Sequence, residues 1–158
     1  MGHSRIGDPV RREEDPRLLK GAGRFVDDVA PRGQMFAFVL RSPHPHAAIR
    51  ALDASKAMAA PGVRLVLTGD DERVRSLGLQ SPRVARKRRD GSAAFVCAQP
   101  HLARARVRYV GDPVAFIVAD TLLQAKDAAE LIEVDYEPLP AVSGTADAVV
   151  PGAPPVWD

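Results

Sequence analysis

Cysteine, aromatic residues and long apolar runs are all scarce in this chain of 158 residues. The single cysteine, Cys97, cannot form an intramolecular disulfide, so we expect a reducing, cytoplasmic setting. No apolar run approaches the roughly 20 residues that a membrane-spanning helix needs. Aromatic residues make up only 5% of the chain, and its apolar content comes mostly from Ala, Val and Leu. Small aliphatic side chains of this kind are typical of a sheet covered by short helices.

The charge of the chain is nearly balanced, at a formal +2 at neutral pH. That excess is too small to indicate nucleic-acid binding through the overall field of the protein. A hydrophobic content of 46% argues against wholesale disorder. The length suits one domain with extended arms.

Composition divides the chain into three parts. Residues 1–33 are polar and punctuated by Gly and Pro, which predicts an extended N-terminal arm that must lie against its own domain or a neighbour to be ordered. Residues 34–137 form the predicted α/β domain, and the proline-rich residues 138–158 an extended connector. Inside the domain, residues 70–100 hold few apolar side chains and predict a long exposed loop.

Short apolar runs bounded by turn residues predict the strands of the domain. Asp53 can cap a short helix that ends before Pro61, and Thr121 with Gln124 has the pattern of a capping box in front of a second helix. Apolar residues at helical spacing in that second helix are Leu122, Ala125, Ala129 and Ile132. The predicted strands are 34–41, 48–52, 63–67, 107–110, 114–119 and 131–136, with a Gly-Asp-Pro turn joining the fourth to the fifth. The result is two strand–helix–strand blocks, an α/β class with a mixed sheet and short flanking helices.

Two histidines are a candidate metal site, because His44 and His46 would share one face of a strand. Zinc needs about four ligands, or three and water, and only Cys97 and His101 could add to the pair. A structured turn around Pro45 is the favoured interpretation. We therefore predict no metal-binding residue. The sequence also shows no nucleophile–base pair or phosphate loop, so we predict no catalytic or cofactor-binding residue in this chain.

Other polar clusters have similar alternatives. The segment 21–24, Gly-Ala-Gly-Arg, could cradle a phosphate, but it lacks the flanking strand and helix of a dinucleotide site and favours a turn with positive φ. Paired acids at 13–15, 27–28 and 70–71 stand near arginines and favour ion pairs over acid–base chemistry. A basic cluster consists of Arg83, Arg86, Lys87, Arg88 and Arg89. Aromatic residues that would stack bases are absent from this cluster, so we do not expect it to bind nucleic acid. We expect a solvated loop. The alternative is contact with an acidic sister subunit.

Several phrases of the sequence, in this order, carry a family resemblance. They are REEDPRLL (12–19), GAGRFVDD (21–28), RSPHPHA (41–47), PGV (61–63), RYVGDPVA (108–115), AAE (128–130), VDYEPLPAV (134–142) and GAPPVWD (152–158). The ordered set resembles the start of the molybdopterin-binding large subunits of the xanthine dehydrogenase and aldehyde oxidase family, with the carbon monoxide dehydrogenase type most similar. The resemblance is poorest across residues 72–96.

The resemblance implies an N-terminal α/β hammerhead domain of an oxidoreductase subunit. It implies a molybdenum–molybdopterin centre in the complete enzyme, which inserts water-derived oxygen at an electrophilic carbon or performs a related oxidation. It also implies iron–sulphur clusters and FAD on companion domains or subunits. The segments that hold the cofactor and the catalytic glutamate have no counterpart in this sequence, so no catalytic residue is carried over.

We expect this chain to act as a wall and docking surface of such a subunit, with the active site outside it. The expected partners are the rest of the large subunit and the iron–sulphur and flavin subunits, with self-association through an uncovered apolar face. The expected contact residues are Arg12, Arg17, Arg24, Arg41, His44 and His46. The alternative is a free-standing, non-catalytic binding or assembly protein on the same scaffold.

Overall fold

A computed structural model describes residues 12–157 of the chain. These residues fall into two compact units, which meet in the sequence between Gln34 and Met35. Among the residues described, no helix has the length and apolar character needed to cross a membrane.

The first unit contains two short helical segments, α1 (Asp15–Leu19) and the 3-10 turn η1 (Val26–Asp28). Pro16 stands in the first turn of α1, where its missing N–H costs no hydrogen bond. Neither segment buries a residue. Leu19 is 87% exposed and Phe25 68%, so the apolar side chains of this unit are left uncovered by the unit itself.

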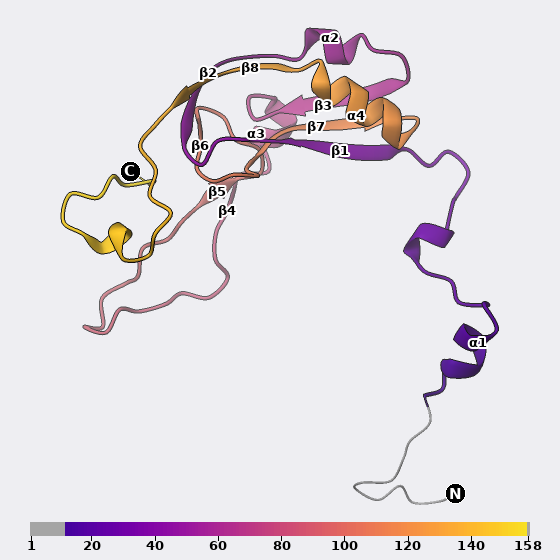
Figure 1. Ribbon diagram of the computed structural model, residues 1–158, viewed down its shortest axis with the longest axis horizontal. Coiled ribbons are helices and arrows are strands. Elements are labelled where there is room, and N and C mark those ends of the chain that lie inside the picture. Colours follow the sequence, from indigo (N-terminus) through magenta and orange to yellow (C-terminus); the bar gives the residue numbers. More distant parts are fainter. Residues whose placement is uncertain (1–11, 158) are drawn as a thin grey trace, which may run out of the picture. The chain divides into compact units, whose positions relative to one another are not determined.

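The second unit contains two antiparallel three-stranded sheets (Figure 1). The first sheet has the order β1 (Phe36–Arg41), β7 (Pro113–Ala119), β3 (Val63–Thr68). The second has the order β6 (Arg106–Val107), β2 (Ala47–Asp53), β8 (Glu133–Pro138). Each sheet is thus built from strands that lie far apart in the sequence.

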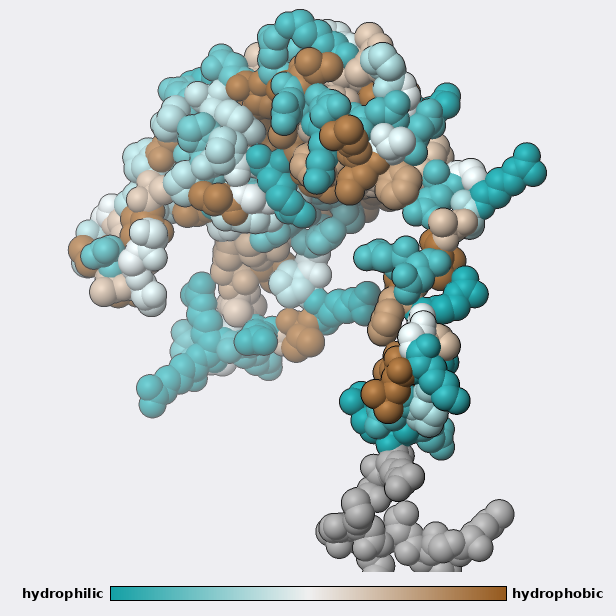
Figure 2. Space-filling view, turned by 45° about the vertical axis from the view of Figure 1, so that its right-hand side comes forward, coloured by the Kyte–Doolittle hydropathy of each residue, from teal (hydrophilic) through white to brown (hydrophobic). Residues whose placement is uncertain are grey.

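Helices α2 (Ser55–Met58) and α4 (Leu122–Glu130) pack on the first sheet. The buried residues of this core are mostly small, which lets α4 lie close to the strands. They include Ala57, Ala115, Ile117, Ala119, Ala125, Ala128 and Ala129. A second cluster of Ala47, Ala103, Val107 and Val114 lies at the second sheet. Figure 2 shows that exposed apolar side chains remain scattered among polar ones on the surface.

The two predicted strand–helix–strand blocks are present, as β2–α2–β3 and β7–α4–β8. The predicted mixed sheet is wrong, because every strand pair in the described residues is antiparallel. The strands are antiparallel because each helix connects two different sheets. In both blocks the helix follows a strand of one sheet and precedes a strand of the other, so neither block makes the parallel pair of a conventional βαβ unit.

Two local predictions also need correction. The strand expected at 107–110 ends at Val107, and the Gly-Asp-Pro turn joins strands of different sheets rather than a hairpin. In the predicted capping box, Thr121 Oγ1 accepts from the backbone N–H of Gln124 at 3.2 Å, as expected. The Gln124 side chain, however, accepts from the Thr121 hydroxyl at 3.0 Å instead of from a backbone N–H.

The segment 70–100 contains short elements within its exposed length. These are α3 (Glu72–Arg75) and the two-stranded pair of β4 (Leu79–Gln80) with β5 (Gln99–Pro100). The chain between β4 and β5 extends away from both sheets (Figure 1). The C-terminal segment after β8 includes one 3-10 turn, η2 (Asp147–Val149).

Candidate functional site

The turn after β1 is joined by hydrogen bonds to the turn before β7. Arg41 Nη1 donates to the carbonyl oxygen of Gly111 at 2.9 Å. Two backbone bonds flank this contact, from Ser42 N to the Asp112 carbonyl at 2.9 Å and from Gly111 N to the Ser42 carbonyl at 2.8 Å. The structure therefore brings the sequence phrases 41–47 and 108–115 into one site, although about 70 residues separate them.

Asp112 organises this site from a half-buried position. Its carboxylate accepts from the backbone N–H of Arg108 at 2.9 Å. Burial raises the pKa of Asp112, and the hydrogen bonds from Arg108 and Tyr109 oppose that rise. Burial likewise raises the pKa of Tyr109, and the neighbouring Asp112 charge adds to it. The predicted role of Asp112 in a turn agrees with these contacts.

The two histidines of the turn serve separate contacts. His44 packs on Tyr136, with ring centroids 4.9 Å apart at 57°. His46 is 4% exposed, and its Nδ1 donates to the Pro140 carbonyl at 2.8 Å. The Leu139 N–H donates to the His46 carbonyl at 2.9 Å, so this residue holds the chain that follows β8. Both rings therefore have roles inside the domain.

The hypothetical metal set does not assemble. His101 Nδ1 lies 2.7 Å from Gln80 Nε2, and Cys97 Sγ accepts from Gln99 at 3.7 Å. Within residues 12–157, no group of three or more His, Cys, Asp or Glu side chains is placed to hold a metal ion. Because zinc needs three or four such ligands, His44 and His46 lack the partners that the metal hypothesis requires.

The glycine-rich segment 21–24 and the paired acids have structural roles. Gly21 has φ +68° and ends α1, with the N–H of Ala22 donating to the Arg17 carbonyl at 3.0 Å. Asp28 accepts from the Phe25 N–H at 2.9 Å. Asp71 accepts from Arg73, whose side-chain and backbone hydrogen bonds lower the pKa of Asp71 to about 2. These contacts agree with the expected turn and ion pairs.

The predicted contact arginines of the first unit lie before, within and after α1, at Arg12, Arg17 and Arg24. Arg17 Nη2 pairs with Glu14 at 3.3 Å, and Arg12 Nε lies 4.0 Å from Asp15. All four charged side chains of these two pairs are exposed, so the pairs contribute little to stability. Arg24 forms no ion pair with any residue of the described chain, which leaves its guanidinium available.

A groove at the second sheet was not foreseen from the sequence. It encloses about 660 Å³ and has three arginines in its lining, Arg104, Arg106 and Arg108. The Arg108 guanidinium carbon lies 4.1 Å from the ring centroid of Trp157, and Arg104 pairs with Asp70 at 3.2 Å. Alternation of arginine with small apolar residues at 103–108 was the available signal. No sequence feature near Trp157 indicated its contact with Arg108.

Known proteins resemble this chain over most of its length. The family model described as "Aldehyde oxidase and xanthine dehydrogenase, a/b hammerhead domain" matches residues 20–140. The carbon monoxide dehydrogenase large chain of Afipia carboxidovorans is 41% identical over 149 residues, which are 94% of this chain and 17% of that one. The nicotine 6-hydroxylase large subunit of Paenarthrobacter nicotinovorans is 39% identical over 137 residues, 87% of this chain and 16% of that one.

Solved structures show the same likeness in three dimensions. The crystal structure of a Cu,Mo-CO dehydrogenase superposes with a TM-score of 0.78 at 40% identity, covering 94% of this chain and 17% of that chain. Quinoline 2-oxidoreductase from Pseudomonas putida 86 gives a TM-score of 0.75 at 39% identity, covering 91% and 18%. The chain thus spans less than a fifth of these relatives.

These matches confirm the resemblance carried by the sequence phrases, and with it the hammerhead fold class. The family match covers both sheets, the helices that pack on them and the site between the turns at 41–46 and 108–113. This chain therefore belongs to the aldehyde oxidase and xanthine dehydrogenase family, with its a/b hammerhead domain at residues 20–140.

Proposed function

We propose that this chain works as the hammerhead part of the molybdenum-cofactor-binding subunit of a molybdenum hydroxylase-type oxidoreductase. Its role there is structural and subunit-docking, and the reaction takes place outside the described residues. The observation that carries this proposal is the superposition of 94% of the chain on one segment of a Cu,Mo-CO dehydrogenase. A segment matching 17% of such a chain corresponds to one domain of a larger assembly.

The proposed cofactor sites lie outside the described residues. Residues 12–157 offer no cluster of metal-binding side chains. The N–H groups of Gly21 and Ala22 donate to the carbonyls of Leu18 and Arg17 at the end of α1, so these two amides are not free to bind a phosphate. We therefore place the molybdenum–molybdopterin centre outside these residues, and the iron–sulphur clusters and FAD on companion domains or subunits. The contribution of this chain is rigidity and contact surface.

The first unit supports a docking role through its uncovered apolar side chains. Leu19, Phe25 and Val26 are 87%, 68% and 87% exposed. Apolar side chains that are exposed to this extent favour contact with another surface, since burying them removes their apolar area from water. Arg24 stands beside Phe25 without an ion pair in the described chain, and an arginine next to an aromatic residue is typical of protein interfaces.

Among the six expected contact residues, we propose that the four arginines face partners. Arg41 is exposed although Nη1 bonds to Gly111, and its other nitrogens can still donate. His44 and His46 support the turn from within, through Tyr136 and Pro140. The proposed contact surface is therefore arginine-rich, and the histidines fix its shape.

Purification of the full protein from its native host tests this proposal. Partners are identified by mass spectrometry, and molybdenum is measured in the same eluate. We expect stoichiometric molybdenum and co-purifying iron–sulphur and flavin polypeptides. A protein recovered alone, without molybdenum, would contradict the proposal and favour the free-standing binding protein.

A further inference from the structure

The tip of the segment between β4 and β5 is a small hairpin, which we call the basic hairpin (residues 83–96). The Arg88 N–H donates to the Ser92 carbonyl at 2.8 Å, and the Ala94 N–H donates to the Arg86 carbonyl at 3.0 Å. Lys87 and Ala93 form an antiparallel bridge between these bonds. The segment therefore has a defined local shape at its tip.

Two side-chain hydrogen bonds stabilise the turn of the hairpin. The Asp90 carboxylate accepts from the Ser92 N–H at 2.9 Å and from its hydroxyl at 2.6 Å. These hydrogen bonds lower the pKa of Asp90, so the carboxylate stays ionised and engaged in the turn. Gly91 has φ +84°, a conformation that favours glycine. A turn that is already ordered by these hydrogen bonds loses less conformational freedom on binding a partner than a flexible loop would.

Charge on the basic hairpin is not neutralised by the rest of the described chain. All five of its cations are exposed and form no ion pair within residues 12–157; they are Arg83, Arg86, Lys87, Arg88 and Arg89. Five cations elsewhere in the same unit are paired with acids: Arg50 with Glu137, Lys56 with Glu133, Arg64 with Asp120, Arg73 with Asp71 and Arg104 with Asp70. This local excess attracts a negatively charged surface.

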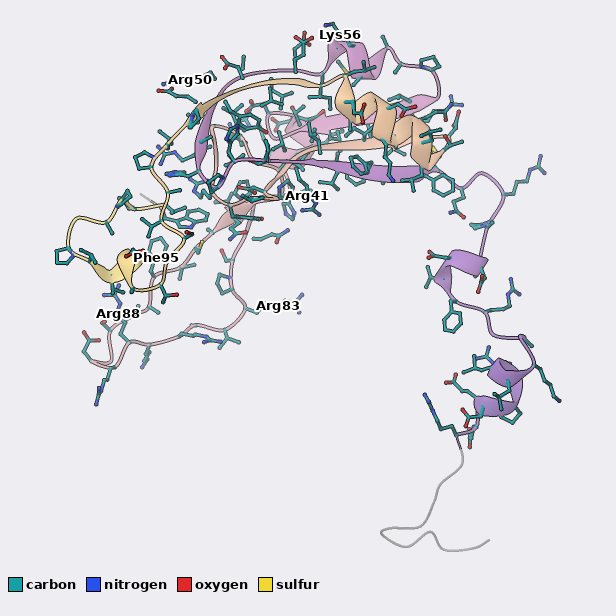
Figure 3. The ribbon with its side chains drawn as sticks, in the orientation of Figure 1. Arg41, Arg50, Lys56, Arg83, Arg88 and Phe95 are labelled. Carbon is teal, nitrogen blue, oxygen red and sulfur yellow. The ribbon has the colours of Figure 1, made fainter. Side chains whose placement is uncertain are left out.

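Bulky apolar side chains accompany the cations. Val84, Phe95 and Val96 are 69%, 61% and 58% exposed. Figure 3 shows Arg88 and Phe95 toward one end of this segment and Arg83 on its other arm, all outside the two sheets. Exposed aromatic and aliphatic groups beside arginines are the composition of a protein-binding surface. A single-stranded nucleic acid site would instead carry successive aromatic stacking platforms, and this hairpin has one aromatic residue.

We propose that the basic hairpin is a docking surface for an acidic face of a companion subunit, an inference that rests on the proposed function. Carboxylates of the partner bind the guanidinium groups of Arg86 and Arg88, which lie two residues apart along one strand of the hairpin and so on one face. Phe95 and the two valines pack against apolar groups around those carboxylates. The site lies in the part of the chain, 72–96, where the family phrases are sparse, so it would give this protein its own choice of partner.

The test uses the assembled complex purified from the native host and the double variant Arg86→Glu/Arg88→Glu. Arg75→Glu/Lys126→Glu is the matched control, with the same change of charge at two exposed cations of α3 and α4. Arg75 lies 3.7 Å from Glu72 in an exposed pair that contributes little to stability. Subunit dissociation is followed by analytical ultracentrifugation at about 50 mM and about 300 mM NaCl, because salt screens exposed charges. We expect the hairpin variant to weaken assembly at least about tenfold at low salt and to flatten its salt dependence, and the control to match wild type.

Two further measurements separate the alternatives. Phe95→Ser should weaken assembly equally at both salt concentrations, and circular dichroism should give every variant the wild-type unfolding midpoint. Assembly of the hairpin variant that equals the control would overturn the docking surface while leaving the proposed function intact. Wild type without companion subunits would overturn both. Hairpin-dependent binding of a DNA oligonucleotide, with assembly unchanged, would replace the acidic subunit with nucleic acid.

Discussion

Arg41 and Gly111 join the end of β1 to the turn before β7 through a 2.9 Å hydrogen bond from guanidinium to carbonyl. Arg41 ends β1, and Gly111 stands in the turn that leads into β7, which pairs with β1 in the same sheet. The register between these strands shifts at Leu40/Arg41, so the regular ladder is interrupted there. The side-chain bond and the two backbone bonds at Ser42 hold the strand ends together past that irregularity.

Gly111→Ala should destabilise the domain by about 1–2 kcal/mol. Gly111 has φ +92°, and a Cβ built there meets no atom within 4 Å, so the cost comes from the backbone conformation alone. Urea unfolding measures the change in the free energy of unfolding. Gly111→Asn is the matched variant, because asparagine tolerates positive φ, and it should cost less than alanine. Equal losses in both variants would show that backbone conformation is not the cause.

Thr121→Ala should destabilise the domain by about 1 kcal/mol, since it removes the N-cap of α4. The Thr121 hydroxyl accepts from the Gln124 N–H, and α4 packs on both β1 and β7. Thermal unfolding followed by circular dichroism measures the loss. Thr121→Ser keeps the hydroxyl and should stay close to wild type. A serine variant as unstable as the alanine variant would assign the effect to the threonine methyl group instead.

The sequence predicts the local elements of this fold better than their pairing. The runs at 34–41, 63–67 and 114–119 correspond to β1, β3 and β7, because an apolar run between turn residues is a local property. Which strands pair depends on the path of the whole chain, and the same runs are compatible with one mixed sheet or two antiparallel ones. The strand predicted at 107–110 stops at Val107, because the Arg108 N–H bonds to the Asp112 carboxylate instead of a neighbouring strand.

The candidate site was predictable only where its residues lie in recognisable phrases. Arg41 and Asp112 belong to such phrases, and the sequence predicted a contact residue at Arg41 and a turn at Asp112. Their hydrogen-bonded arrangement was not predicted, since it depends on the pairing of β1 with β7. His46 looked like a candidate contact or ligand because its burial beside Pro140 is a tertiary property. The groove at Trp157 depends likewise on where the C-terminal segment returns.

Asp71 should titrate about two pH units below an ordinary aspartate, at a pKa of about 2. Arg73 causes this shift, so Arg73→Gln should raise the pKa of Asp71 toward its ordinary value. A folded-state pKa below the unfolded one stabilises the fold above about pH 4, and this contribution disappears as pH falls from about 4 to about 2. Carboxyl titration by NMR measures the pKa, and Arg75→Gln, which removes the partner of Glu72, should leave it unchanged.

Ala125→Leu should destabilise the domain by about 1–3 kcal/mol through overpacking. Ala125 is fully buried where α4 meets the first sheet, in a core whose residues are mostly small. Denaturant unfolding measures the loss. Lys126→Leu, an exposed neighbour on the same helix, introduces the same side chain without overpacking and should cost under about 0.5 kcal/mol. Similar losses in both variants would mean that helix propensity or surface polarity, rather than packing, sets the effect.

Trp157 is the one tryptophan of the chain, so its fluorescence reports the contact with Arg108 directly. The guanidinium carbon lies 4.1 Å from the indole centroid, close enough for a cation–π interaction that holds the C-terminal segment against the groove. Arg108→Ala should shift the emission to longer wavelength and make acrylamide quenching more effective, because the ring gains contact with water. Arg104→Ala is the control: Arg104 lines the same groove but pairs with Asp70, so its loss should leave the emission unchanged. If both variants shifted the emission alike, the general charge of the groove, rather than stacking by Arg108, would hold Trp157 in place.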